Sequence, residues 1–311
     1  MINKNTFSIL CSVLFLSVSP IVGALQISVE THDGNSSYLI ALLKFCDVMD
    51  KLGASQNASC RVFMGNKSTK EDASHISQDI YNFSLISADR AYKNKYSSID
   101  SLSVDINFVT QIYRRKVFLL AAPSSNIKSV KDLKGKKVLV TNTDFMKAFA
   151  NILNAHGIQL HQVKVSNNTV NDNGQNRCMG KDIDAVFYEG PDKDPKVADF
   201  VWACKYKVIP IILTEKLKAI YPYYKSTTVV RKKNNGKGVP SITVPVVALS
   251  STDTSYYRVG FFLETFFNHA IALDKILQTI DGKAVDYMEN VTSLPMHPAA
   301  FEIKQKLKGN N

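Results

Sequence analysis

The sequence lacks the short motifs that identify most common enzymes. It has no Gly-x-Ser-x-Gly turn, and Gly135-Lys136-Lys137 has neither the upstream glycine nor the Ser/Thr of a Walker loop. The six histidines include no His-x-x-x-His or Glu-x-x-His pair; His156 and His161 only flank a glycine turn. These absences lower the expectation of an enzyme, although catalytic groups can also assemble from distant residues.

Long apolar runs are also absent from residue 25 onward. No stretch in this part of the chain approaches the ~18 apolar residues of a membrane span. The start of the chain is different. Lys4 precedes an apolar stretch over residues 7–22, and Val22-Gly23-Ala24 has the small residues of a cleavage site. An uncleaved anchor is the alternative, but this stretch is short for a span. We therefore expect a signal peptide over residues 1–24, cleaved near Ala24, and a soluble periplasmic protein.

Cysteine is scarce, and no Cys-x-x-Cys pair is present. Removal of the signal peptide would leave Cys46, Cys60, Cys178 and Cys204, and an even count in an exported protein favours disulfides over a metal site. Three connectivities are open, and buried free thiols are the alternative. Pairing between neighbours in sequence would put one bridge in each half, each contributing roughly 3 to 4 kcal/mol.

Charge is unbalanced, with 38 Lys and Arg against 27 Asp and Glu. A basic surface could attract anions, nucleic acid or anionic lipid. However, no basic run interleaves with aromatic residues as single-strand nucleic-acid binding requires, so we expect no nucleic-acid partner. A compositional bias toward Lys and Asn is the simpler explanation of the net charge.

Apolar runs of strand length alternate with segments of helical periodicity, as in an open, largely parallel sheet. The first βα series has strands at about 25–30, 59–64 and 83–88, and a second begins with the strand 137–141 and a helix that stops at Gly157. Two unusually long extended stretches, at about 107–122 and 239–251, bracket the second series. We predict an α/β fold of two Rossmann-like lobes joined by these two hinge strands. Lobe 1 would comprise residues 25–113 and 248–311, and lobe 2 residues 114–247.

Ligands of such sheets bind beyond the carboxyl ends of the strands. The loops there are rich in hydroxyl, amide and aromatic groups, which suit a solute site with a few placed donors. The same residue types also simply make turns and cap helices.

Several segments resemble the TAXI-type solute-binding proteins of TRAP transporters. "IKSVKDLKGKKVLV", "KDIDAVFYEGP", "IYPYY" and "LPMHPAAFEIKQKL" are similar to segments of that family in the expected order, and "FSLISAD" falls where the family has a strand ending in a polar turn. The resemblance implies a periplasmic binding protein of type II-like fold. It also implies the pairs Cys46–Cys60 and Cys178–Cys204, because many members carry cysteines at these places.

The departures from the family fall in the expected ligand cleft. "THDGNSSYLI", "MGNKST" and "TNTDF" stand where the family has glycine-rich loops, and "EGPDKDP" replaces a Gly-His-Pro turn. Such glycines let backbone N–H groups approach an anion. Their loss puts the carboxylate ligands of the family in doubt.

We therefore predict a monomeric protein, without cofactor or metal, that captures a small solute, anionic solutes included, between two lobes. It would deliver the solute to the membrane subunits of a TRAP transporter. Asp144 is expected to cap a helix and His297 to have a packing role. The residues expected to contact the solute are Thr31, His32, Ser36, Tyr38, Ser68, Ser87 and Asp89 from lobe 1, and Thr141, Asn142, Thr143, Tyr188 and Glu189 from lobe 2.

Two other functions stay open. The first is an exported enzyme on the same scaffold, for which Asp89 and Glu189 are the candidate acid/base pair. The second is an interaction protein whose ligand cleft has degenerated, which would be consistent with the missing glycines.

Overall fold

The chain folds into two compact units. Unit 1 comprises residues 1–86, 98–112 and 247–311, and unit 2 comprises residues 87–97 and 113–246. Residues 87–97, expected in lobe 1, thus group with unit 2. The computed structural model describes residues 25–31, 36–53, 58–64, 81–92, 105–142, 145–166, 178, 182–191, 194–229, 238–277 and 284–309.

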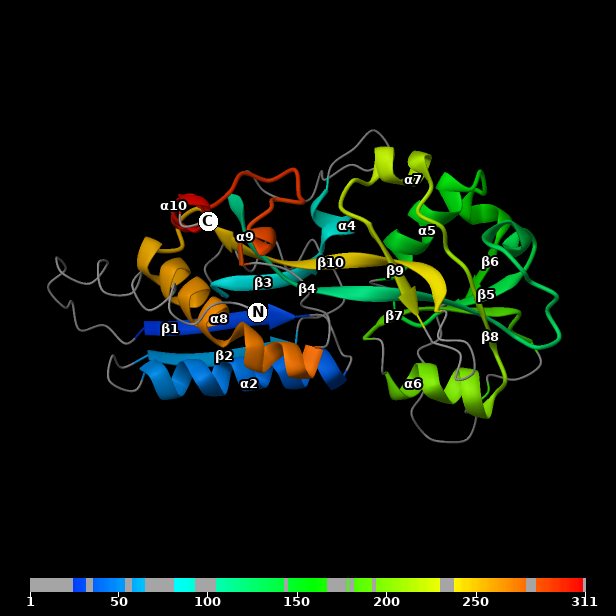
Figure 1. The fold of residues 1–311 in the computed structure, drawn as a ribbon, viewed down its shortest axis with the longest axis horizontal. Helices are drawn as coiled ribbons and strands as arrows, with labels where there is room; N and C mark the ends of the chain where they lie inside the picture. The colour runs from blue at the N-terminus through cyan, green and yellow to red at the C-terminus, as the bar shows by residue number, and fades with distance from the viewer. Residues whose placement is uncertain are drawn as a thin grey trace, which may run out of the picture. The chain divides into compact units, whose positions relative to one another are not determined.

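Unit 1 is built on three parallel strands covered by helices (Figure 1). The central strand β1 (Leu25–Thr31) pairs with β2 (Ala58–Met64) on one side and with β3 (Phe83–Ser87) on the other. Helix α2 (Ser36–Gly53) packs against β2 and against α8 (Tyr256–Leu277). Aromatic rings fill the space between these elements, so the core of unit 1 is a cluster of phenylalanines: Phe45, Phe83, Phe262 and Phe266.

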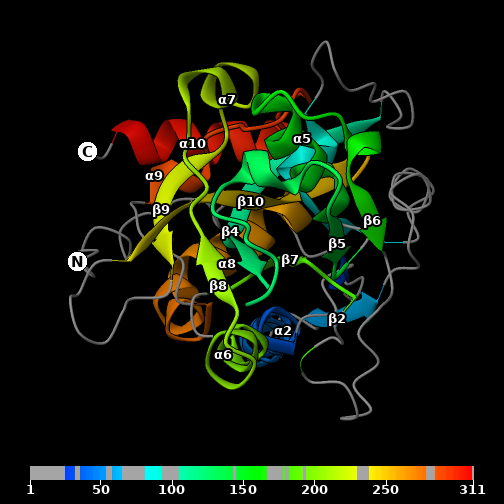
Figure 2. The same ribbon diagram turned by 90° about the vertical axis from the view of Figure 1, so that its right-hand side faces the viewer.

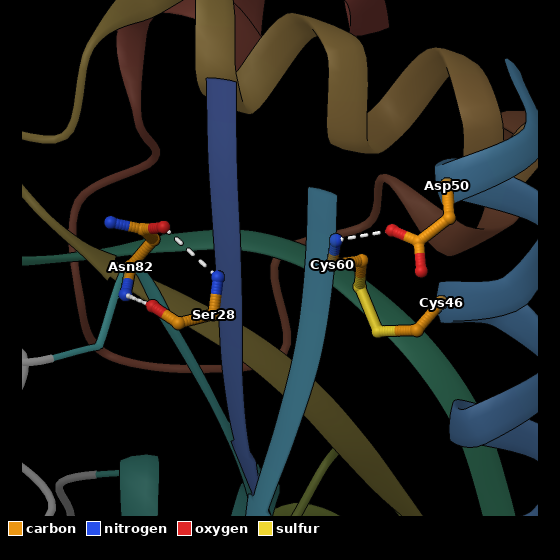
Figure 3. The surroundings of a disulfide bond; sticks show 5 residues. All are labelled: Ser28, Cys46, Asp50, Cys60 and Asn82. Carbon is orange, nitrogen blue, oxygen red and sulfur yellow. Dashed lines mark hydrogen bonds between the residues drawn. A yellow bond between two sulfur atoms is a disulfide. The ribbon is translucent and has the colours of Figure 1, made fainter. Parts of the chain in front are cut away.

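The disulfide Cys46–Cys60 ties α2 to β2 within this unit (Figure 3). Next to it, Asp50 of α2 accepts a hydrogen bond from the Cys60 N–H at 2.5 Å. On the far side of β1, Ser28 and Asn82 exchange two hydrogen bonds of 3.0 and 2.9 Å. The bridge expected from the family resemblance is therefore confirmed, and polar pairs fix the same strands.

The end of the chain completes unit 1 with short α9 (Ala284–Tyr287) and α10 (Pro298–Gly309). Buried His297 precedes α10. Its Nδ1 lies 3.2 Å from the Ala299 N–H and its Nε2 lies 3.0 Å from the Thr254 carbonyl, so Nδ1 accepts and Nε2 donates. Burial lowers the pKa of His297, which keeps the ring neutral. The packing role predicted for His297 is confirmed.

Two long strands run from one unit into the other. Strand β4 (Ile106–Ala121) and strand β10 (Val239–Ser251) are almost wholly buried, which suits their apolar sequences. Both were expected from the sequence at nearly these limits.

Unit 2 adds five shorter strands: β5 (Lys137–Val140), β6 (Lys164–Ser166), β7 (Ala185–Gly190), β8 (Lys207–Ile209) and β9 (Lys225–Val229). The strand order in this unit is β4-β7-β5-β6. Strands β7 and β6 pair in parallel with β5, whereas β4 runs antiparallel to β7. In addition, β8 pairs with β4 and β9 with β10, both antiparallel. Strand β9 was not predicted from the sequence.

Helix α5 (Met146–Ala155) buries its apolar side, including Phe149, Ile152 and Leu153. It ends where predicted: Gly157 is left-handed at φ +80°, and the Ile158 N–H donates to the Leu153 carbonyl. Helices α5 and α7 (Glu215–Ile220) lie on one side of the strands of unit 2 and α6 (Pro195–Ala198) on the other (Figure 2). The remaining helical segments are α4 (Ala88–Ala91), η2 (Val130–Leu133), η4 (Leu160–Gln162) and the π-helical turn η5 (Asp199–Ala203).

A second disulfide, Cys178–Cys204, lies within unit 2. Its formation confirms the other predicted pair. Across the described ranges, every helix is too short or too polar to span a bilayer.

Candidate functional site: two polar clusters of unit 2

The carboxyl ends of β5 and β7 bring four of the predicted site residues to one edge of unit 2. Val140, the last residue of β5, lies opposite Phe187. Beyond this pair β7 continues and β5 gives way to a loop, where the Thr141 N–H donates to the Phe187 carbonyl at 3.3 Å. We call this group the carboxyl-edge cluster: Thr141, Asn142, Tyr188 and Glu189, with Arg115 and Phe145 as neighbours.

A buried ion pair lies at the base of this cluster. The Arg115 Nη1 atom of β4 lies 3.3 Å from Glu189 Oε2, and the two side chains are only 4% and 1% exposed. The guanidinium carbon also lies 5.3 Å from the centre of the Phe145 ring. Because each charge is compensated by the other, removing one partner would leave a buried charge, at a cost of about 3 to 5 kcal/mol.

The Tyr188 side chain is hydrogen-bonded within unit 2. Its hydroxyl donates to Asp194 Oδ2 at 2.6 Å, and Asp194 in turn caps α6 by accepting from the Lys196 N–H. Gly190 makes room for the ring, since a Cβ atom there would lie 2.6 Å from a carbon of Tyr188. Tyr188 therefore contributes its aromatic ring to the carboxyl-edge cluster, while its hydroxyl group is hydrogen-bonded to Asp194.

The second cluster surrounds Asp89 at the start of α4. Asp89 Oδ1 accepts hydrogen bonds from Tyr223 at 2.7 Å, from Tyr224 at 2.5 Å and from the Asn151 amide at 2.9 Å. Oδ2 accepts from Ser87 at 3.1 Å. We call this group the Asp89 cluster.

Electrostatics keep the donors of the Asp89 cluster protonated. Burial raises the pKa of Asp89, and the four hydrogen bonds oppose that rise. Burial first, and the Asp89 carboxylate second, raise the pKa of Tyr223 and of Tyr224. Both phenols therefore remain donors. The Asp89 carboxylate has its oxygens taken by intramolecular donors, so its role in this structure is to hold α4, α5 and the Tyr223–Tyr224 segment together.

The predicted site residues thus divide into four groups. The carboxyl-edge cluster assembles four of them, while Ser87 and Asp89 meet in the other cluster. Thr31 ends β1 in unit 1 and is fully buried. The last group lies outside the described residues, or has its side chain outside them: His32, Ser36, Tyr38, Ser68 and Thr143, together with the predicted cap Asp144.

Sequence reasoning missed Arg115, Asn151, Tyr223 and Tyr224. One signal was available for Arg115, since "YRRK" interrupts an otherwise apolar strand. Asn151 lies among apolar positions of α5 in the same way. Tyr223 and Tyr224 were noticed only as part of a family segment. In the described part of the chain, no three His, Cys, Asp or Glu side chains are grouped to hold a metal ion.

The NMT1-like family pattern matches residues 47–303, which is most of the chain. The chain belongs to the NMT1-like family. A comparison with curated proteins found no match.

Solved structures show the fold of this NMT1-like protein. It is similar to a Xanthomonas citri protein bound to ATP, with 11% identity and a TM-score of 0.53 over 93% of this chain and 97% of the other. A structure described as a periplasmic transporter has 14% identity and a TM-score of 0.52 over 92% and 94% of the two chains. The fold is therefore the type II-like fold of bilobal solute-binding proteins, as predicted. The narrower resemblance to TAXI proteins stays a prediction.

Proposed function

We propose that the protein is an exported solute-binding protein of TAXI type, which captures a small solute in the periplasm and delivers it to the membrane subunits of a TRAP transporter. Family membership and the solute-binding fold support capture of a solute. Two disulfides agree with an oxidising compartment. The sequence segments quoted above, which resemble segments of TAXI proteins, support a TRAP transporter as the recipient of the solute.

The observation that carries the proposal is the carboxyl-edge cluster. Half-buried Thr141 and Asn142 follow β5 at the end of the sheet where α/β proteins bind ligands, beside an aromatic wall. Hydroxyl and amide groups in such a place hold and orient a polar solute. We place Thr141 and Asn142 first among the solute-contacting residues.

The Arg115–Glu189 pair bears on the class of solute. A free guanidinium would favour a carboxylate solute, but here Glu189 already neutralises Arg115. The Arg115–Glu189 pair therefore adds no net charge to the site. Together with the lost glycine-rich loops, this favours a neutral or zwitterionic polar solute over an anionic one.

The enzyme alternative needs an acid/base pair, for which Asp89 and Glu189 were the candidates. Asp89 serves four intramolecular donors and Glu189 is paired with Arg115. Both carboxylates thus have structural partners in place of a reacting group. We therefore favour binding without turnover.

The test is native mass spectrometry of the protein isolated from its own periplasm, followed by calorimetry with the retained solute. We expect one solute per chain, released unchanged. The double variant Thr141→Ala/Asn142→Ala should weaken its binding at least about tenfold, since each lost hydrogen bond costs roughly 1 kcal/mol. Ser226→Ala, an exposed change on β9, is the matched control and should bind normally.

Three outcomes would contradict the proposal. A chemically altered solute would identify an enzyme. The absence of any retained solute, with no thermal shift across a broad metabolite panel, would favour an interaction protein with a degenerate cleft. Normal solute binding without association with TRAP membrane subunits would remove only the delivery step.

A further inference from the structure

The two units differ sharply in charge. Unit 2 contains 26 Lys and Arg against 11 Asp and Glu, whereas unit 1 contains 12 against 16. The net positive charge of the protein therefore belongs entirely to unit 2. A uniform compositional bias toward lysine would have charged both units alike, so it does not explain this distribution.

The strand register of unit 2 gathers lysines at one end of its sheet. Lys137 and Lys164, the first residues of β5 and β6, lie directly opposite each other. Lys207 begins β8 and lies opposite Ala121, the last residue of β4. Ala121 also lies opposite Ala185 at the start of β7, so these strand ends share one edge. This is the amino-terminal end of the parallel strands, and the carboxyl-edge cluster lies at the other end.

Neighbouring turns add further lysines to this edge. The turn before β5 carries Lys134 and Lys136 and is held against the start of β6, because the Gly135 N–H donates to the Gln162 carbonyl at 2.8 Å. Lys205 lies two residues before the start of β8 and is exposed. We call this set the basic edge; it consists of Lys134, Lys136, Lys137, Lys164, Lys205 and Lys207.

The opposing charge at the basic edge is small. Strand register brings Asp184 and Asp182 to the same end, and Asp184 lies 3.8 Å from the Lys136 ammonium. All other lysines of the set are exposed. Every cation in the set is Lys and none is Arg. Ammonium groups act as hydrated point charges, whereas Arg supplies the bidentate geometry that recognises single carboxylates or phosphates.

The only tryptophan of the chain adjoins this edge. Trp202 is 54% exposed on η5, three residues before Lys205. Its turn is rigidly attached, since Phe200 packs on Tyr206 and Cys204 forms the second disulfide. Exposing an indole to water is unfavourable, and the boundary between lipid headgroups and acyl chains is a preferred environment for it.

We propose that the basic edge and Trp202 form a docking surface for an anionic phospholipid bilayer. Dispersed lysines suit a delocalised negative surface. A protein partner is less well matched, because protein interfaces are depleted in Lys and enriched in Arg. Docking through this edge leaves the carboxyl-edge cluster of unit 2 uncovered. The inference does not depend on the identity of the solute, and it adds a membrane contact that needs no transporter.

The test uses the full mature protein and vesicles of phosphatidylcholine with or without phosphatidylglycerol. Since Trp202 is the only tryptophan, its emission should shift to the blue with anionic vesicles, and added salt should reverse binding. Lys134→Gln/Lys137→Gln/Lys164→Gln should lower the partition coefficient at least about tenfold. Circular dichroism checks that the variants fold.

The matched control removes the same charge from α10 of unit 1: Lys304→Gln/Lys306→Gln/Lys308→Gln. It should leave vesicle binding unchanged. Equal losses in both triple variants would overturn the proposal, because net charge alone would then explain binding. So would an absence of binding to anionic vesicles, an unshifted Trp202 emission on bound protein, or binding to soluble polyglutamate in place of vesicles. Failure here would leave solute capture untouched, since vesicle binding is measured without solute.

Discussion

At the scale of single residues, the two carboxylates of the candidate acid/base pair, Asp89 and Glu189, each have polar partners within unit 2. Asp89 gathers two phenols, a hydroxyl and an amide, and Glu189 neutralises Arg115. The two arrangements differ energetically. The carboxylate of Asp89 is surrounded by neutral donors, so its desolvation is offset only by hydrogen bonds, whereas Glu189 has a full opposite charge. This is why burial raises the pKa of Asp89.

Asp89→Asn and Asp89→Ala should therefore behave differently. Asn keeps an acceptor for the donors, whereas Ala leaves buried donors unsatisfied and should cost about 3 kcal/mol. With its pKa raised from 3.8, protonated Asp89 contributes stability that is present at low pH and is lost as pH rises through the folded-state pKa. Relative to Asp89→Asn, the wild type should thus lose stability as the pH rises above about 4, the ordinary pKa of the carboxyl group, toward its raised pKa in the folded state. Urea unfolding measures this; the opposite trend would contradict it.

At the scale of elements, α5 links the two polar clusters. Phe145 at its start contacts Arg115 and Tyr188, and Asn151 in its middle binds Asp89. The position of the helix therefore fixes both clusters at once. Its end depends on Gly157, whose left-handed conformation turns the chain toward β6. A change at this end tests backbone conformation alone, because an added Cβ atom would meet nothing within 4 Å.

Gly157→Ala should lower the free energy of unfolding by about 1 kcal/mol, since a left-handed conformation disfavours a Cβ atom. Gly260→Ala is the matched control. That glycine lies inside α8, also has open space around its Cβ position, and has no left-handed backbone. It should gain roughly 0.5 to 1 kcal/mol, because Ala is the better helix former. Chemical denaturation of both variants should give shifts of opposite sign; equal signs would refute the backbone explanation.

At the scale of the whole molecule, each unit has its own disulfide and its own sign of charge, and β4 and β10 connect them. Each disulfide cross-links one unit by itself. The chain also passes between the units on either side of residues 87–97. The expected export also concerns the whole molecule. It would remove the signal peptide and bring the four cysteines into a compartment where disulfides form.

Intact mass spectrometry of the exported protein should show loss of residues 1–24, with β1 then starting at the new terminus. Reduction should add the mass of four hydrogens, one for each cysteine of the two bridges. Denaturation without reduction should change nothing. The mass of the full 311-residue chain, or free thiols before reduction, would contradict export with cleavage.

The sequence by itself determined the order of strands and helices, the two long connecting strands and the stop of α5 at Gly157. These features depend on periodicity and backbone preference, which act between near neighbours. For the same reason it predicted that Thr141, Asn142, Tyr188 and Glu189 lie near the carboxyl ends of strands, and the structure has them near the ends of β5 and β7. Contact of these residues with a solute stays a prediction. Short β9 was missed because "KSTTV" has little apolar pattern.

Only the tertiary structure decided what these side chains do. Asp89 and Tyr224 are 135 residues apart in the chain, and Arg115 and Glu189 are 74 apart. No local pattern encodes such pairs, because they form only when helices and strands pack and exclude water from charged groups. The gathering of lysines at the basic edge likewise depends on strand register. The residue types predicted polar clusters, and packing decided which of their polar groups pair with each other.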